Sequence, residues 1–329
     1  MLVRIAVDRV EIQAPAKINL FLEILAKRPD GYHEIETLMS PIGLYDSLTF
    51  RATESPDIHL DCRWTAGLSG HKPEAPAKES AAPSPTLSFA RASGLCQSEN
   101  SLGDLPPPEQ NIVFQAASLL QQRSRCDRGG EIRLVKRIPS AAGLGGASSD
   151  AAAVLVAASI GWELNWSRKQ LAELAAELGS DIPFFLGSGS AICRGRGERI
   201  EAIGPVHLHV VVVRPPVGLS TPQVYQRCRP ASTPESVHKL QFGLRRGNWN
   251  EVKSALVNRL EEPAAGLTPW IGRLRQEFQD AGCIAQQMSG SGSSYFGICE
   301  NAHHARRVAG RLRSRDLGMV IATTTMTRR

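Results

Sequence analysis

A run of small residues near the middle of the chain has the composition of a phosphate-binding loop. It reads Pro-Ser-Ala-Ala-Gly-Leu-Gly-Gly-Ala-Ser-Ser over residues 139–149. Small side chains let the backbone approach a ligand closely, and the free amides of a following helix attract anions. The run lacks the Gly-Lys-Ser/Thr of a Walker A loop and the G-x-G-x-x-G of dinucleotide folds. On composition alone, an ordinary strand-to-helix turn therefore remains an equal alternative.

Two charged residues could support group transfer, although each also has an ordinary structural explanation. The segment from Ile18 to Ile24 alternates, which places Lys17 and Asn19 together on the face opposite the apolar side chains. A lysine there is usually a solvated strand residue, but beside Asn19 it could form a polar floor. Asp181 precedes Ile-Pro, a pattern typical of a helix N-cap.

Several further residues could contact a ligand. Tyr32 and His33 follow an Asp-Gly turn signal, which is also typical of a hairpin. Residues 288–294, Met-Ser-Gly-Ser-Gly-Ser-Ser, form a second glycine-rich turn before an expected strand. Asn111 stands where the N-cap of an expected helix belongs.

Together these stretches resemble the GHMP kinase superfamily. The pattern Pro-x-x-x-Gly-Leu-Gly-Gly-x-Ser-Ser-Asp-Ala-Ala at residues 139–152 is similar to its nucleotide loop. Pro-Ala-Lys-Ile-Asn-Leu (15–20), Arg-Pro-Asp-Gly-Tyr-His (28–33) and Leu-Gly-Ser-Asp-Ile-Pro (178–183) look like the members that phosphorylate 4-diphosphocytidyl-2-C-methylerythritol. The elements occur in the family's order and cover most of the chain outside residues 65–108.

The resemblance implies an ATP-dependent small-molecule kinase that phosphorylates the 2-hydroxyl of this cytidine compound, in the non-mevalonate isoprenoid pathway. ATP would be the co-substrate, and Mg²⁺ would travel with it. The implied fold is α+β, with the active site in the cleft between two domains. We expect an N-terminal domain over residues 1–213, interrupted by a mostly disordered insertion at 65–108, and a C-terminal domain over 214–329. The insertion is expected because the segment is rich in Pro, Ser and Ala and nearly free of aromatic residues.

The resemblance also implies roles for individual residues. The expected catalytic residues are Lys17 and Asp181, with Asp181 accepting the proton of the attacking hydroxyl. The expected ATP-binding residues are Asn111, Pro139, Ser140, Ala141, Ala142, Gly143, Leu144, Gly145, Gly146, Ala147, Ser148 and Ser149. The expected substrate-binding residues are Asn19, Tyr32, His33, Thr221, Tyr225, Gly290, Ser291 and Gly292. Ala147 departs from the pattern, because many members have a third glycine there; a positive φ at this alanine would cost on the order of 1 kcal/mol.

Composition and motifs also bear on two alternative functions, a nucleic-acid-binding protein and a GHMP kinase with another substrate. With 329 residues the chain is long enough for about two domains. The net charge of +6 and an arginine-rich C-terminal region could indicate a nucleic-acid-binding protein. Only 5% of residues are aromatic, however, so base stacking is poorly supplied. A GHMP kinase acting on mevalonate or homoserine is a third alternative, which Asp-Gly-Tyr-His disfavours because those substrates carry no base.

The number and spacing of the cysteines indicate the compartment in which the protein works. The seven cysteines are odd in number and show no C-x-x-C spacing, which argues against a disulfide framework and a zinc site. We therefore expect a cytoplasmic protein without a signal peptide, whose partners are small molecules rather than nucleic acid or membrane.

Periodicity predicts the elements that must position these residues. The expected strands are Val3–Val7, Ile18–Leu25, Ser47–Arg51, Glu131–Lys136, His207–Val213, Tyr295–Cys299 and Val320–Thr324. The expected helices are Asn111–Arg123, Ser148–Ser159, Ser167–Leu178, Trp249–Leu260, Pro269–Ala281 and Ala302–Arg313. Because strands and helices do not alternate strictly, an all-parallel sheet is not expected.

Overall fold

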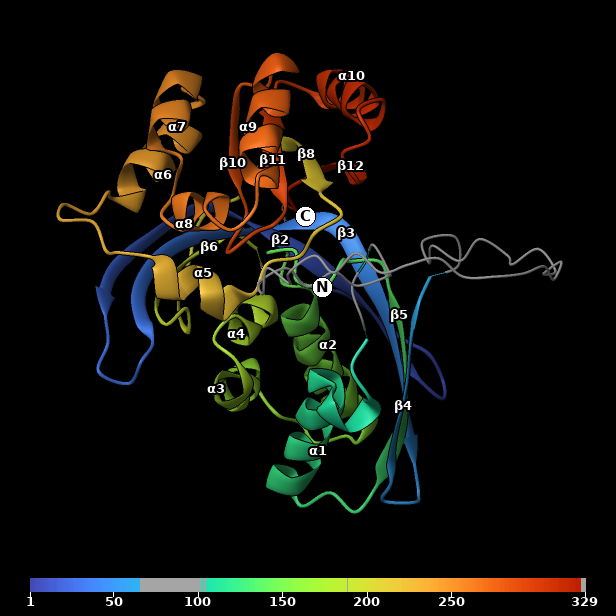
Figure 1. Cartoon of the computed structure of the whole chain (residues 1–329). Coiled ribbons are helices and arrows are strands. Elements are labelled where there is room, and N and C mark those ends of the chain that lie inside the picture. The colour runs from blue at the N-terminus through green and yellow to red at the C-terminus, as the bar shows by residue number, and fades with distance from the viewer. Residues whose placement is uncertain (66–101, 103–104, 188, 327–329) are drawn as a thin grey trace, which may run out of the picture.

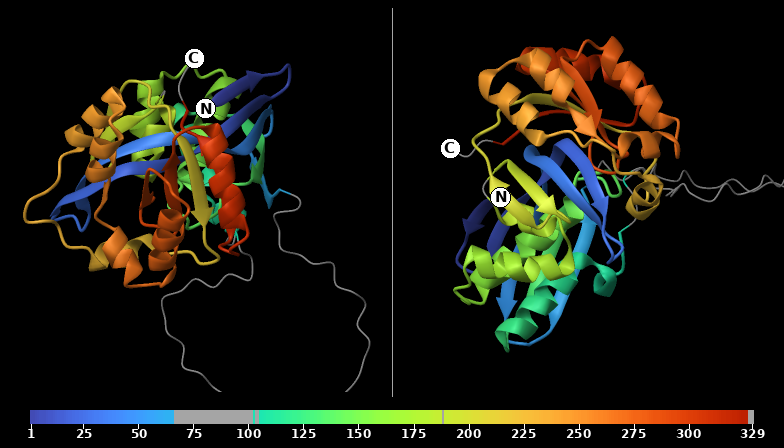
Figure 2. Two further views of the ribbon diagram at one scale, coloured as in Figure 1. Left: turned by 90° about the horizontal axis from the view of Figure 1, so that it is seen from above. Right: turned by 90° about the vertical axis from the view of Figure 1, so that its left-hand side faces the viewer.

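The computed structural model describes residues 1–65, 102, 105–187 and 189–326. The expected insertion at 65–108 lies mostly outside these residues. Within it, Leu102 is described: it is buried, and its carbonyl accepts a hydrogen bond from the Ser140 amide at 2.8 Å. The fold is a mixture of α and β in two halves, as expected (Figures 1 and 2).

The first sheet is built on two long antiparallel strands, β2 (Val10–Lys27) and β3 (His33–Thr53). Its strand order is β1-β2-β3-β5-β4, with β6 added to β3, β7 added to β6, and the short β9 added to β2. The pairs β2·β9 and β4·β5 are parallel and the others are antiparallel. The remaining strands are β1 (Leu2–Ile5), β4 (Ile58–Trp64), β5 (Gly129–Lys136), β6 (Ala191–Gly195), β7 (Arg199–Ala202) and β9 (Val257–Asn258).

An irregularity in the pairing of β2 with β3 lies where β2 passes from one half of the molecule to the other. The register with β3 shifts by two residues between Pro15 and Ala16, because β3 carries two extra residues, Gly43 and Leu44, between Ile42 and Tyr45. An irregularity of this kind redirects the side chains beside it. Val10, Ile12 and Ala14 belong to the core beneath the sheet. Ala16, Ile18 and Leu20, which continue the same alternation, belong instead to the core shared with the second sheet. Lys17 and Asn19 are thereby turned toward the side of the sheet that carries the lower helices.

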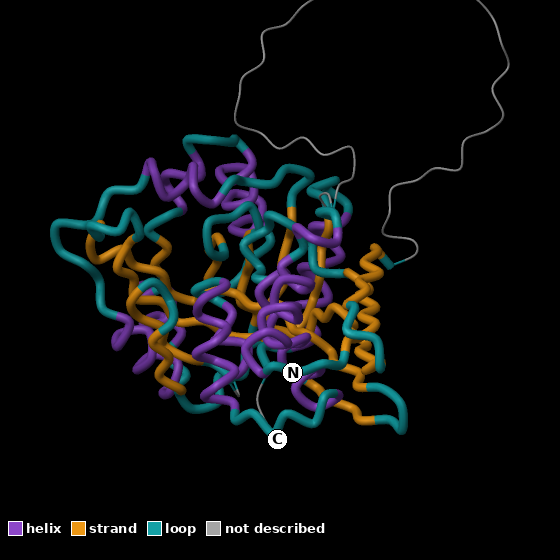
Figure 3. Tube along the Cα trace, turned by 90° about the horizontal axis from the view of Figure 1, so that it is seen from below, coloured by secondary structure: helices purple, strands orange, loops and turns teal. Residues whose placement is uncertain are grey.

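The lower helices are α1 (Ile112–Ser124), α2 (Gly146–Gly161), α3 (Arg168–Leu178) and α4 (Ile182–Leu186), and they cover one face of the first sheet (Figures 1 and 3). Helix α2 is central and buried nearly all round, which its alanine-rich sequence permits because small side chains allow close packing. The cap expected at Asn111 is confirmed for α1, where its side chain accepts a hydrogen bond from the Val113 amide. Helix α3 begins with a capping box formed by Ser167 and Gln170.

The second sheet is antiparallel in the order β10-β11-β8-β12. Its strands are β8 (His209–Arg214), β10 (Ala285–Met288), β11 (Tyr295–Cys299) and β12 (Met319–Thr324). The upper helices are α5 (Thr221–Arg227), α6 (Val237–Arg246), α7 (Trp249–Ala255), α8 (Glu261–Ala265), α9 (Trp270–Asp280) and α10 (Ala302–Arg313). The 3₁₀ helix η1 (Pro108–Gln110) leads into α1 in the lower half.

The expected domain boundary at 213/214 falls inside β8, and both strands that pair with β8 belong to the second sheet. A boundary that follows the sheets would therefore lie before His209.

Among the residues that the structure describes, no helix is both long enough and apolar enough to cross a membrane.

Candidate active site

A cavity of about 680 Å³ lies between the two halves. It is lined by β2, β3, the loop between β5 and α2, the start of α5, and the turn at Gly290 and Ser291. Most of the expected site residues line it: Lys17, Asn19, Tyr32, His33, Pro139, Ser140, Ala141, Ala142, Gly143, Leu144, Gly145, Gly146, Ala147, Ser148, Asp181, Thr221, Tyr225, Gly290 and Ser291. Three expected residues, Asn111, Ser149 and Gly292, are not part of its lining.

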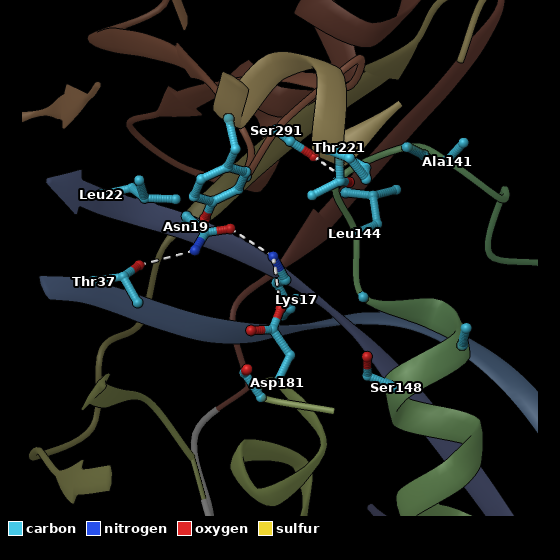
Figure 4. A pocket seen from close by; sticks show the side chains of 18 of the residues that line it. Lys17, Asn19, Leu22, Thr37, Ala141, Leu144, Ser148, Asp181, Thr221 and Ser291 are labelled. Carbon is cyan, nitrogen blue, oxygen red and sulfur yellow. Dashed lines mark hydrogen bonds and ion pairs between the residues drawn. The ribbon is translucent and has the colours of Figure 1, made fainter. Parts of the chain in front are cut away.

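Lys17 lies at the centre of the cavity in a chain of polar contacts (Figure 4). Its Nζ donates to Asn19 Oδ1 at 2.6 Å and lies 3.7 Å from Asp181 Oδ2. Asn19 Nδ2 in turn donates to Thr37 Oγ1 at 2.8 Å. Burial lowers the pKa of Lys17, and the Asp181 carboxylate opposes that effect. The ammonium is therefore held in place by an amide oxygen and faced by a single carboxylate.

Asp181 occupies the N-cap position of α4, but its side chain makes no capping hydrogen bond. Its carboxylate points to Lys17 instead (Figure 4). The side chain is about a third exposed, whereas Lys17 is almost fully buried. Asp181 is consequently available to a molecule in the cavity, which a carboxylate engaged in capping would not be.

The loop between β5 and α2 presents a helix N-terminus to the cavity. Gly145, the N-cap residue of α2, has φ +69° and no side chain to satisfy the first amides of the helix. Such free amides are a ready anion site. The expected penalty at Ala147 does not arise, because this residue lies within α2; positive φ falls instead on Ala141, Gly143 and Gly145.

The two glycine-rich turns are held against each other. Ser289 Oγ donates to the Gly143 carbonyl at 2.9 Å, and the Ser294 amide donates to the Ala142 carbonyl at 3.1 Å. A Cβ at Gly143, whose φ is +71°, would lie 2.0 Å from the Ser289 carbonyl oxygen. Only glycine allows this approach, so the second turn fixes the shape of the first.

The far end of the cavity carries aromatic rings. His33 and Tyr225 lie with ring centroids 5.3 Å apart, and the Arg196 guanidinium sits 5.0 Å from the centroid of Tyr32. Burial lowers the pKa of His33, helped by the nearby charge of Lys27, which favours the neutral imidazole. Thr221 of α5 and Ser291 of the turn between β10 and β11 share a hydrogen bond at 2.8 Å on the wall formed by the second half.

The structure also places the three expected residues that do not line the cavity. Asn111 caps α1 through its Oδ1. Ser149 is fully buried just behind the loop, and its Oγ has no partner among the described residues. Gly292 lies beyond Ser291, with φ +84°.

Sequence reasoning missed several cavity residues, of which six are polar: Lys27, Thr37, Lys136, Ser180, Arg196 and Gln226. Arg196 had a local signal, because it stands between two glycines at a strand turn, and Lys136 directly precedes the loop. Thr37 and Lys27 had none. Of the charged side chains that line the described cavity, Lys17, Lys27, Lys136 and Arg196 are cationic and Asp181 is anionic. The cavity therefore favours anionic ligands.

Comparison with known proteins agrees with this arrangement. Residues 111–192 match the family model of the GHMP kinases N terminal domain, and residues 243–316 match that of the GHMP kinases C terminal domain. A crystal structure of homoserine kinase from Cytophaga hutchinsonii shares the fold, with a TM-score of 0.70 at 16% identity over 99% of this chain and 97% of that one.

More similar proteins narrow the class. The 4-diphosphocytidyl-2-C-methyl-D-erythritol kinase of Pelotomaculum thermopropionicum is 38% identical over 94% of this chain and 96% of its own length. That of Rhodopirellula baltica is 36% identical over 91% and 90%. A crystal structure of 4-(cytidine 5'-diphospho)-2C-methyl-D-erythritol kinase superposes with a TM-score of 0.73 at 33% identity, over 96% of this chain and 100% of that one. The chain belongs to the 4-diphosphocytidyl-2-C-methyl-D-erythritol kinase family of GHMP kinases.

Proposed function

We propose that this protein transfers the γ-phosphoryl group of ATP to the 2-hydroxyl of 4-diphosphocytidyl-2-C-methyl-D-erythritol, giving the 2-phosphate and ADP in the non-mevalonate isoprenoid pathway. The observation that carries the proposal is the Lys17–Asp181 pair, 3.7 Å apart. It lies in a single cavity with an anion-binding loop and the His33–Tyr225 aromatic pair.

The ATP phosphates bind at the N-terminus of α2. Residues 139–148 supply backbone amides and small side chains around them, and the cations of the cavity attract them. Asn111 and Ser149 act from behind the loop, since neither lines the cavity. Asn111 contributes by capping α1 next to the nucleotide site, and its side chain does not contact the nucleotide directly.

The transfer itself forms a bond between the substrate oxygen and the γ-phosphorus and breaks the bond from that phosphorus to the β–γ bridging oxygen. The proton of the 2-hydroxyl passes to Asp181, whose carboxylate is not engaged in capping. Lys17 stabilises the negative charge on the transferred group. Because phosphoryl transfer has a loose transition state, Asp181 contributes more by orienting the hydroxyl than by strong base catalysis.

Cytosine is recognised at the aromatic end of the cavity. Tyr32 and Tyr225 provide ring faces for stacking, and His33 hydrogen-bonds the edge of the base. The lowered pKa of His33 supports this role, because a neutral imidazole has both a donor and an acceptor nitrogen. The part of the substrate between the base and the reacting hydroxyl is held by Asn19, Thr221, Gly290, Ser291 and the neighbouring Gly292.

Mg²⁺ enters bound to ATP. A Mg²⁺ carried by nucleotide phosphates needs only one or two protein oxygens and keeps several waters. Asp181, which lines the cavity, could supply one such oxygen, and the ion would neutralise phosphate charge during transfer. Among the described residues no group of three or more His, Cys, Asp or Glu side chains could hold a metal ion.

We further propose that the protein works in the cytoplasm on small molecules and binds neither nucleic acid nor membranes. In the part of the chain that the structure describes, the cysteines are free thiols, which suits a reducing compartment.

The deciding experiment is ADP release with the cytidine substrate, compared with mevalonate and homoserine at equal concentrations. We expect turnover with the cytidine compound alone and a product phosphorylated at the 2-position. Equal or better turnover of mevalonate or homoserine would overturn the substrate assignment, while leaving a kinase of the same fold.

A further inference from the structure

Three buried charged side chains lie directly behind the phosphate loop. Lys136, at the end of β5, contacts Asp46 of β3 and forms an ion pair of 2.5 Å with Asp150 of α2. None of the three side chains is more than 7% exposed. Asp46 and Asp150 do not line the cavity, and no role was expected for them from the sequence.

The cluster ties together the two ends of the loop. At the start of the loop, Asp46 Oδ1 accepts hydrogen bonds from the amides of Arg137 and Ile138, the latter at 2.9 Å. At its end, Asp150 projects from the first turns of α2, the helix whose N-terminus faces the cavity. Lys136 joins both carboxylates. Its Nζ lies only 3.3 Å from the position a Cβ would take at Gly146, the first residue of α2.

Stability alone does not account for such a cluster. Burying charges costs solvation, and a buried ion pair is often no more stabilising than apolar side chains of the same size. Burial alone would lower the pKa of Lys136, but the charges of Asp150 and Asp46 outweigh it and raise the pKa above its usual value. Lys136 is therefore a fixed ammonium with two fixed partners, an arrangement that specifies geometry.

We propose that Asp46, Lys136 and Asp150 are positioning residues that hold the two ends of the phosphate loop at the spacing ATP requires. The inference rests on the proposed function, because it takes ATP as the ligand of the loop. The proposal predicts an effect on ATP binding that is larger than the effect on the cytidine substrate. Loosening the cluster should weaken the nucleotide site and leave the cytidine end of the cavity, which β2, β3 and α5 build, largely unchanged.

The test uses Asp150→Ala and Asp150→Asn in the full chain. Alanine suits a helix and its neighbours in α2 are alanines, so the fold should tolerate the first variant. It removes the link from α2 to Lys136, and we expect a roughly ten- to hundredfold rise in the KM for ATP and in the ADP dissociation constant. The KM for the cytidine substrate should stay within about threefold of the parent enzyme. Asparagine retains an oxygen for Lys136, so Asp150→Asn should restore most of the ATP affinity.

Asp46→Ala tests the other end of the loop and should give the same selective loss. Glu23→Ala is the matched control, because Glu23 is also fully buried and forms an ion pair of 2.7 Å with Arg259, away from the loop. It should lower the melting temperature without a selective effect on ATP. An unchanged ATP affinity in a folded Asp150→Ala protein, or an equal rise in both KM values, would overturn the proposal.

ADP binding by calorimetry keeps this test separate from the assignment of the substrate. If the parent protein bound ADP but did not phosphorylate the cytidine compound, the proposed function would fail. The variants would still show, from their ADP dissociation constants, whether the cluster shapes the nucleotide site.

Discussion

At the scale of single residues, the contact of Asp181 with Lys17 indicates a chemical rather than a structural role for Asp181. Asp181 occupies the N-cap position of α4, but its side chain makes no capping hydrogen bond. Its Oδ2 lies 3.7 Å from Lys17 Nζ. Asp181→Asn keeps the shape and removes the proton acceptor. We expect kcat to fall roughly 10²–10⁴-fold, with ADP affinity by calorimetry unchanged.

Glu177→Gln, which changes an exposed carboxylate of α3 paired with Arg123, serves as the control and should retain full turnover. Near-normal kcat in Asp181→Asn, with an intact fold, would reduce Asp181 to a structural residue.

His33 leads to a prediction about pH. Burial and Lys27 lower its pKa below the usual value near 6.5, so the neutral imidazole persists into mildly acidic solution. As the pH falls through the lowered pKa, protonation removes an acceptor nitrogen, and kcat/KM for the cytidine substrate should decline. Lys27→Gln removes one cause of the lowering, so the acidic limb should move to higher pH.

The measurement is kcat/KM against pH between about pH 5 and 8 for both enzymes. Because the two enzymes differ only at residue 27, the difference between their profiles reports on the effect of Lys27 on His33. A limb that stayed in place, or moved to lower pH, would show that His33 does not govern recognition of the base.

At the scale of elements, the loop between β5 and α2 takes its shape from segments distant in sequence. One support comes from Leu102, whose carbonyl accepts the Ser140 amide. Replacing residues 66–101 by a short Gly/Ser linker should leave kcat/KM within about threefold, because the free energy of connecting two fixed chain ends changes little with the length of the connection.

A longer replacement, of residues 66–107, also removes Leu102 and should raise the KM for ATP. The two proteins are compared in the same ADP-release assay, with melting temperature as a check on folding. Equal activity in both would mean that the Leu102 contact is dispensable.

At the scale of the whole molecule, the site depends on the approach of the two glycine-rich turns. Gly143→Ala combines a positive φ, which costs on the order of 1 kcal/mol, with a Cβ 2.0 Å from the Ser289 carbonyl oxygen. Relief of that overlap must separate the turns and should cost about 1–3 kcal/mol more. We expect a lower melting temperature together with a large loss of kcat.

Gly272→Ala is the matched control, because Gly272 lies within α9 and a Cβ there would meet no atom within 4 Å. It should raise stability by roughly 0.5–1 kcal/mol and leave activity unchanged. A Gly143→Ala enzyme with parental stability and turnover would show that the turns need not touch.

Much of the chain could be predicted from local sequence. The helix expected at Ser167–Leu178 is confirmed as α3, because a capping box and an apolar period are local signals. The expected strand and loop before α2 are confirmed for the same reason. The helix expected at Trp249–Leu260 is wrong beyond Ala255, because Val257 and Asn258 pair with β2 and Asn258 donates to the carbonyls of Met288 and Gly290. No local pattern contains those partners.

The sequence by itself determined the small-residue loop, the caps, and the alternation that puts Lys17 and Asn19 on one face. Only the tertiary structure decided which way that face points. Lys17 faces Asp181 just after the register shift between β2 and β3 at Pro15 and Ala16, whereas regular pairing of the two strands would direct it to the opposite side of the sheet. Burial of Lys136 between Asp46 and Asp150 is likewise a property of three elements packed together. Contacts between distant segments depend on packing free energy summed over the whole fold, which a local window of sequence does not contain.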